Sequence, residues 1–179
     1  APQVAAKVAA RAEGNPFYAG EIVRSILERA PDLAEDAVDA ALAALPDTVQ
    51  ATVLARIDLL EGPARRMLQI GSVFGRSFPL DGLVAVEPAI GDPSEGLDQL
   101  VDRDLVRRGL DNDYTFRHIL IREVAYGTLP RAERSRLHAA AARFLADGAN
   151  GRADELAELI AYHFREAATV GSLFGEVPE

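Results

Sequence analysis

The stretch LVRRGLDNDYTFRH, Leu105–His118, changes the repeat of the sequence from that of a helix to that of a strand. Within it, Tyr114 and Phe116 alternate with polar neighbours, as the two faces of a strand require. The letters DND separate LVRRGL from YTFRH and are a turn signal. The stretch therefore predicts a β-hairpin of two short strands.

Three helical segments precede this hairpin. Pro63 suits the first turn of one, residues 80–86 form the second, and Ser94 is a candidate N-cap for the third. The letters GRSFP, between the first two, are expected to form a turn. Three helices followed by a two-stranded hairpin are the winged-helix arrangement, a helix-turn-helix core with a β wing.

The N-terminal part of the chain predicts helices that are joined by an abrupt break. Residues 1–13 form one helix, and the break follows at Gly14-Asn15-Pro16. Glycine suits the left-handed position that closes a helix, asparagine is a favoured N-cap, and proline fits the first helical position. The next helix is expected to bury one stripe, which consists of Ile22, Val23, Ile26 and Leu27.

Helices also follow the hairpin. Residues 119–126 are apolar on one side, and Pro130 opens a further helix. The last predicted helix, residues 153–168, has one broad apolar face that comprises Leu156, Leu159, Ile160, His163, Phe164 and Ala167. The fold class is therefore expected to be mainly α, with a single β-hairpin.

Composition excludes several classes of protein. The 179 residues carry a net charge of −9, which disfavours nucleic-acid binding. The chain has no cysteine, which excludes disulfides and fits an intracellular compartment. It shows no apolar run of membrane-spanning length and no signal peptide. Lys7, the only lysine, lies in an alanine-rich stretch without the glycines of a P-loop, so the sequence contains no P-loop.

No set of residues forms a self-sufficient active site. His118, His138 and His163 show no metal-ligand spacing, and no Gly-x-Ser-x-Gly elbow is present. His163 lies on an apolar face and is expected to be a packed core residue. His138 lies in an arginine-rich helix and is expected at the surface. We therefore expect no catalytic residue, no metal site and no enzyme in this chain.

Four segments, in this order, resemble the STAND class of signal-transduction ATPases, which are AAA+-like: AEGNPFYAGEIVRSILE, LPDTVQATVLARIDLL, RRMLQIGSVFGRSF and YTFRHILIREVAYGTLPRAERSRLHAAAARFL. They look most like the ATPase regions of bacterial proteins linked to adenylate or guanylate cyclase domains or to transcription-regulator domains. The resemblance covers nearly the whole chain. In this class a P-loop domain comes first, followed by a helical lid, a winged helix and helical repeats.

The resemblance implies how the chain is divided. It implies a helical lid at 1–45, a winged-helix domain at 46–128, the start of a helical repeat at 129–170 and a tail at 171–179. We expect the chain to be a piece of a longer protein. Its partners would then be its own upstream P-loop domain and its own downstream helical repeats.

The resemblance also implies residues that contact a nucleotide. Gly14-Asn15-Pro16 matches the Gly-x-Pro motif of the lid, whose proline packs near the adenine. His118 matches the histidine of the class's Met-His-Asp segment, which contacts the β-phosphate of ADP in the closed, inactive state. Ile119 stands where the better-known members have Asp. The implied cofactor is ADP or ATP in the intact protein, with Mg²⁺ held by the P-loop domain, and none for this chain alone.

The function implied is regulatory: the chain clamps nucleotide held by the P-loop domain and relays its state to an effector. The resemblance also implies a cytoplasmic location and allows self-association in the active state, without a membrane partner. Two alternatives remain open, a DNA-binding winged helix and a protein-interaction scaffold of helical repeats. The DNA-reading helix would be 92–104, which holds Glu95, Asp98, Asp102 and Asp104 against a single arginine, Arg103. Such a surface suits a phosphate backbone poorly, and nucleic acid is not the expected partner.

Overall fold

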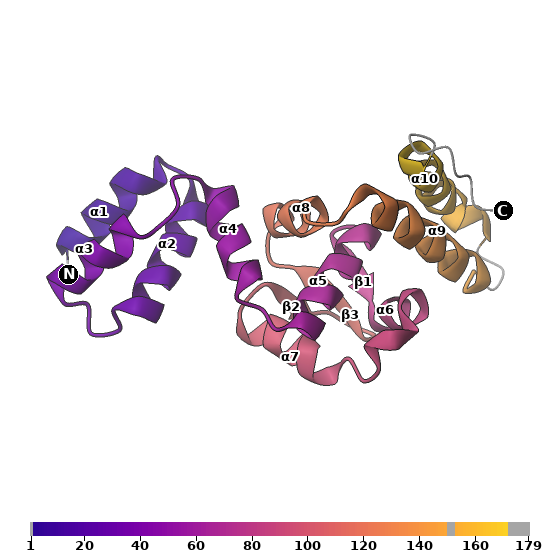
Figure 1. Cartoon of the computed structure of the whole chain (residues 1–179), viewed down its shortest axis with the longest axis horizontal. Coiled ribbons are helices and arrows are strands. Elements are labelled where there is room, and N and C mark those ends of the chain that lie inside the picture. Colours follow the sequence, from indigo (N-terminus) through magenta and orange to yellow (C-terminus); the bar gives the residue numbers. More distant parts are fainter. Residues whose placement is uncertain (1, 150–152, 172–179) are drawn as a thin grey trace. The chain divides into compact units, whose positions relative to one another are not determined.

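The computed structural model describes residues 2–149 and 153–171, which form two compact units that divide after Asp58 (Figure 1). The chain is mainly helical and includes a small antiparallel sheet of three strands. The mainly α fold class is therefore confirmed in its coarse form. Among the described residues, no helix combines the length and the apolar character that crossing a bilayer requires. Apart from Gly171, the predicted tail at 171–179 lies outside the described residues.

The first unit consists of four helices, which are α1 (Pro2–Ala12), α2 (Pro16–Arg29), α3 (Glu35–Ala43) and α4 (Val49–Asp58). Its core includes Ile22 and Ile26 of α2, which are fully buried as predicted. The other two residues of the predicted stripe are exposed, Val23 by 43% and Leu27 by 49%. Val23 and Leu27 each follow one of these isoleucines by one residue, which is a rotation of about 100° around the helix. They therefore point away from the side that α1 and α3 cover.

Polar contacts fix the end of this unit. Glu21 of α2 forms a largely buried ion pair with Arg56 of α4. The hydroxyl of Tyr18 donates to the carbonyl of Pro46 at 2.9 Å, and Arg11 donates to the carbonyl of Leu45 at 2.8 Å. The link from α3 to α4 is therefore held by both preceding helices, since α1 supplies the arginine and α2 the tyrosine.

The second unit contains the remaining helices and the sheet. Its first part comprises α5 (Gly62–Phe74), β1 (Ser77–Pro79), α6 (Leu80–Val86), the 3₁₀-helix η1 (Pro88–Ile90) and α7 (Ser94–Asp102). Its second part comprises β2 (Val106–Arg108), β3 (Asp113–Phe116), α8 (Ile119–Gly127), α9 (Arg131–Asp147) and α10 (Ala153–Gly171). The predicted helices and the predicted hairpin of β2 and β3 are confirmed.

The sheet has one strand more than the sequence predicts. The letters GRSFP do not form only a turn, because Ser77–Pro79 pairs with β3 as strand β1. β3 is the central strand, with Phe78 of β1 opposite Tyr114 and Val106 of β2 opposite Phe116. The ring of Phe78 stacks on that of Tyr114 at 5.8 Å between centroids and meets that of Phe116 edge-on at 5.4 Å.

Two glycines let α5 pack closely against its neighbours. A Cβ on Gly71 would lie 2.7 Å from the ring of Phe78, so β1 sits directly on the helix. A Cβ on Gly96 of α7 would lie 2.7 Å from the sulfur of Met67 of α5. A side chain at Gly71 would push β1 away from α5, whereas one at Gly96 would displace the flexible end of the Met67 side chain.

The start of α7 differs from the prediction. Ser94 is the first residue of the helix, and the predicted capping role is wrong. Asp92 accepts instead, from the N–H of Ser94 at 2.9 Å and from its hydroxyl at 2.7 Å. The hydrogen bond from the Ser94 side chain, followed by that from its N–H, lowers the pKa of the Asp92 carboxyl.

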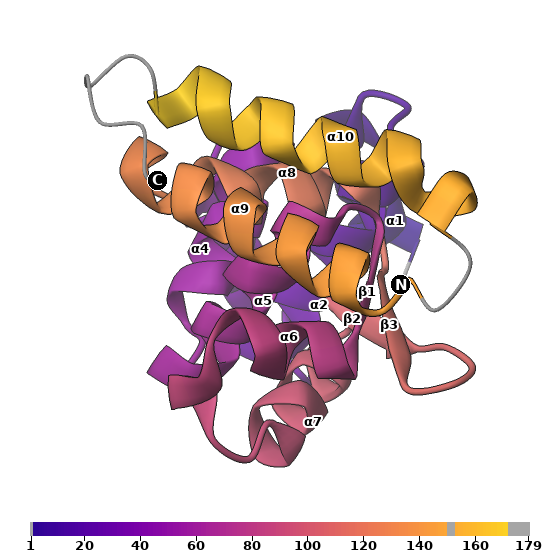
Figure 2. The ribbon, with the colours of Figure 1, turned by 90° about the vertical axis from the view of Figure 1, so that its right-hand side faces the viewer.

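The last two helices form an antiparallel pair. Figure 2 shows α10 lying along α9, and the hydroxyl of Ser135 near the start of α9 donates to the carbonyl of Ala167 near the end of α10 at 2.7 Å. The predicted broad face of α10 is narrower than expected. His163 is fully buried, but Leu159 and Phe164 are exposed by 40% and 45%. Packing against one neighbour covers only one stripe of a helix.

Candidate functional site

The predicted break at Gly14-Asn15-Pro16 is an exposed turn between α1 and α2. Gly14 has a φ of +80°, the left-handed conformation that favours glycine, and open space lies around its Cα. The N–H of Asn15 donates to the carbonyl of Ala12 at 2.8 Å and closes α1. Glycine is therefore needed here for its backbone angle and not for a close approach.

Asn15 and Pro16 begin the second helix as predicted. The side-chain oxygen of Asn15 accepts from the N–H groups of Phe17 and Tyr18, both at 3.1 Å, and Pro16 is the first helical residue. Two of the four donors that a helix start leaves unpaired are thus satisfied. Hydrogen bonds thus close α1 and open α2 on either side of the turn, and its three residues are exposed.

His118 lies in the second unit, between β3 and α8. It is the N-cap residue of α8, and its Nδ1 accepts a hydrogen bond from the N–H of Leu120 at 3.2 Å. The preceding residue is fixed twice: the N–H of Arg117 donates to the carbonyl of Leu105 at 3.0 Å, and its Nε lies 2.6 Å from a carboxylate oxygen of Asp104. The imidazole is therefore held at a defined helix start.

The capping bond also determines where the imidazole carries its hydrogen. An Nδ1 that accepts from Leu120 has no hydrogen of its own, so the neutral ring is protonated at Nε2. The ring is half-buried, and Ile119 beside it is 43% exposed. His118 thus offers an N–H donor at the N-terminus of α8, where the partial positive charge of the helix favours an anion.

The structure places these four residues in two groups. Gly14, Asn15 and Pro16 lie together in one turn of the first unit, whereas His118 belongs to the second unit. Within the described residues, no three His, Asp or Glu side chains are grouped so that they could hold a metal ion.

The structure brings together two histidines that the sequence analysis treats separately. His138 is fully buried and not at the surface, because it packs against α10, where His163 is also fully buried. Their Nδ1 atoms lie 2.9 Å apart, and Nε2 of His138 lies 3.0 Å from the hydroxyl of Tyr126. A local signal does exist, since His138 continues the helical stripe of Ala141, Ala142 and Leu145.

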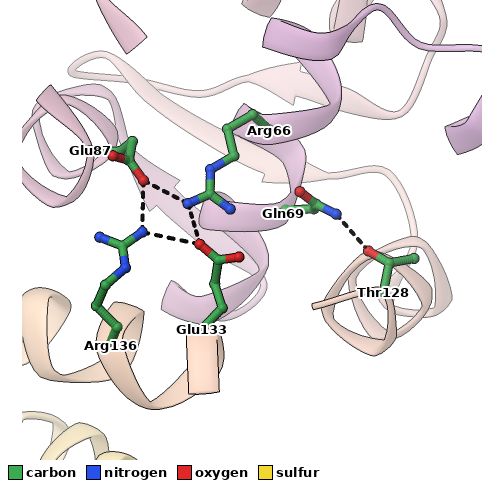
Figure 3. A network of polar contacts seen from close by, with 6 residues as sticks. All are labelled: Arg66, Gln69, Glu87, Thr128, Glu133 and Arg136. Carbon is green, nitrogen blue, oxygen red and sulfur yellow. Dashed lines mark hydrogen bonds and ion pairs between the residues drawn. The ribbon is translucent and has the colours of Figure 1, made fainter. Parts of the chain in front are cut away.

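A second group that sequence reasoning missed is a ring of four alternating charges (Figure 3). Arg66 of α5 donates to Glu87 at 2.6 Å and to Glu133 at 2.7 Å, and Arg136 donates to the same two carboxylates at 2.7 and 3.2 Å. Hydrogen bonds from Arg66, the main cause, and from Arg136 lower the pKa of both carboxyls. The ring joins α5, the end of α6 and α9.

Comparison of the chain with protein-family models, with curated proteins and with solved structures found no match.

Proposed function

We propose that this chain is the regulatory part of a nucleotide-switched signalling ATPase. In this proposal it performs no chemistry alone, but closes over ADP or ATP held by a P-loop domain of the intact, cytoplasmic protein and relays the nucleotide state to an effector. The resemblance of the four ordered segments to the STAND class supports this assignment. In this proposal residues 1–45 correspond to the lid, and α9 and α10 correspond to the start of the helical repeats.

The second unit supports the winged-helix part of the proposal. Its elements follow one another as α5, β1, α6, α7, β2 and β3, and the strands lie in the order β1-β3-β2. Besides three helices and a hairpin, this unit contains the short strand β1, which pairs with β3, the second strand of the hairpin. Asp111 and Asn112, which both have a positive φ, form the tip of this wing.

The observation that carries the functional proposal is the geometry of His118. Its Nε2–H is a hydrogen-bond donor, and the N-terminus of α8 adds partial positive charge at the same place. Bound nucleotide would supply a charged phosphate oxygen as acceptor. His118 would hold that oxygen while the hydrogen bond from Leu120 keeps the ring in position and the pair of Arg117 with Asp104 fixes the preceding residue. Loss of the contact would release the second unit from the nucleotide.

The acidic face of α7 does not favour the DNA-binding alternative. Glu95, Asp98 and Asp102 are exposed on this helix, and Asp98 is paired with Arg108 of β2. Phosphate contacts need clustered cationic side chains, and this surface has the opposite sign. A nucleotide-controlled module remains the function that the residues support best.

Calorimetric titration with ADP and ATP tests the proposal. The chain alone should show no micromolar binding, because the backbone N–H groups and the lysine of a P-loop hold most of a nucleotide's phosphate charge. The same chain joined to its own upstream P-loop domain should bind with a stoichiometry of one. Micromolar binding by the chain alone, or no binding by the longer protein, would contradict the proposal.

A further inference from the structure

Two imidazoles meet in a buried contact between the last two helices. His138 of α9 and His163 of α10 are both fully buried, and their Nδ1 atoms lie 2.9 Å apart. A hydrogen bond between two nitrogens needs one hydrogen, so one Nδ1 donates and the other accepts. This contact requires at least one neutral ring, since two charged rings would place two N–H groups face to face.

A third side chain extends this contact to α8. The hydroxyl of Tyr126 lies 3.0 Å from Nε2 of His138. At the other end, Nε2 of His163 is buried without a hydrogen-bond partner among the described residues. A charged His163 would carry a hydrogen on this nitrogen and bury it unpaired, which is strongly unfavourable. The arrangement therefore favours the neutral pair over a pair with two charged rings.

Charged and aromatic groups from four helices surround the pair. From α8 and α9, the guanidinium groups of Arg122 and Arg134 lie 4.9 and 4.5 Å from the ring centre of Tyr126. From α10, the ring of Tyr162 meets both imidazoles edge-on. Burial raises the pKa of Tyr126, and the negative charge of Glu166 of α10 raises it further. From α5, the ring of Phe74 lies 6.3 Å from that of His163.

Burial is the main reason why both imidazoles resist a proton. Burial first, and the positive charge of Arg122 in addition, lower the pKa of His138 and that of His163 from 6.5 to about 4. His163 and Arg134 add to the effect on His138. Departure of α10 from α9 would let water reach both rings and would remove the main cause of the lowered pKa.

We propose that Tyr126, His138 and His163 form a proton-sensitive latch, which holds α10 on α9 while both imidazoles are neutral and releases α10 when they are protonated. The latch matters because much of α10 is uncovered: Leu159, Tyr162 and Phe164 are each at least 39% exposed. Apolar burial therefore supplies only part of the attachment. The inference is independent of the proposed nucleotide control.

The direction and size of the effect follow from the lowered pKa values. A basic group with a lowered pKa in the docked state favours docking fully above pH 6.5, and this contribution is lost as the pH falls towards 4. For two imidazoles the docking constant should fall by roughly several hundred-fold from pH 7 to pH 5. For one imidazole the fall should be about twenty-fold.

A fluorescent reporter on α10 tests the latch. The chain has no tryptophan, so Tyr162→Trp provides a single reporter beside both imidazoles. As the pH falls, its emission should report release of α10, and the steepness of the pH dependence should correspond to uptake of about two protons. In His163→Gln the steepness should correspond to one proton. The control Arg108→Gln, which removes only a largely exposed pair with Asp98, should keep the two-proton dependence. A transition that persists unchanged in His138→Gln/His163→Gln would overturn the proposal.

A measurement on the unmodified chain covers the case in which a variant fails to fold. Nitrogen NMR of the imidazoles and of the backbone amides, followed from pH 7.5 to pH 4, should show His138 and His163 becoming charged together with the loss of protected amides in α10. Amides of α5 should stay protected through this step. If either imidazole becomes charged while α10 stays protected, or if α5 and α10 open together, the latch is wrong.

Discussion

The imidazole Nδ1 of His118 accepts a hydrogen bond from the backbone N–H of Leu120 at 3.2 Å and thereby caps α8. The same residue thus has two separable features. Its Nδ1 stabilises the helix start, and its Nε2–H is the donor that the functional proposal needs. Substitutions that keep one feature and remove the other distinguish them.

The capping role predicts different effects for two substitutions of His118. His118→Ala should lower the unfolding free energy of the second unit by about 1 kcal/mol, because it leaves a helix-start N–H without its acceptor. His118→Asn should stay within about 0.5 kcal/mol of the wild type, since asparagine is a favoured N-cap. Urea unfolding followed by circular dichroism measures both. Equal stabilities of the Ala and Asn variants would show that the cap contributes nothing.

The close packing of α5 on β1 predicts opposite outcomes for two helical glycines. Gly71→Ala should destabilise the second unit by about 1–3 kcal/mol, because its Cβ would lie 2.7 Å from the ring of Phe78. Gly20→Ala in α2 meets open space and should stabilise the first unit by about 0.5–1 kcal/mol. Thermal unfolding of the two variants gives the comparison, and a stabilising Gly71→Ala would show that β1 does not sit directly on α5.

The ring of four charges predicts that loss of Arg66 lowers the unfolding free energy by an amount that depends on pH. Arg66→Gln should lower the unfolding free energy at pH 7 by about 1–2 kcal/mol, because it leaves Glu87 and Glu133 with Arg136 as their remaining partner in the ring. The control Arg108→Gln breaks a largely exposed pair with Asp98 and should change the unfolding free energy by less than about 0.5 kcal/mol.

The sign of the pH dependence follows from the two carboxyls. Arg66 lowers their pKa in the folded state, so their contribution is present above pH 4.5 and is lost as the pH falls. The difference between wild type and Arg66→Gln should therefore shrink below pH 4.5. Urea unfolding at pH 7 and pH 3.5 tests this, and a difference that grows in acid would contradict the assigned role of Arg66.

Local patterns in the sequence predict much of this fold. Apolar residues at helical spacing indicate the helices, and Gly14-Asn15-Pro16 indicates the break between α1 and α2 because each residue type has one conformational reason to be there. Strand β1 has no comparable signal. Its three residues become a strand by pairing with β3, nearly forty positions further along the chain.

The candidate site shows the same division between local and long-range information. The backbone role of Asn15 could be predicted, because a cap involves only neighbouring residues. The contact of His138 with His163 could not, since it depends on how α10 lies against α9. Likewise, the ring around Arg66 joins three elements that only the tertiary fold brings together.

The central claim is that His118 holds nucleotide through its Nε2–H, and the most direct test is the rate of ADP release from the intact protein with its P-loop domain. Stopped-flow release should be compared for wild type and His118→Asn, the variant that keeps the helix cap. Loss of a hydrogen bond to a charged oxygen, worth about 1.5–3 kcal/mol, predicts release that is roughly ten- to a hundred-fold faster. Equal release rates for the two proteins would contradict the claim and leave His118 as a capping residue alone.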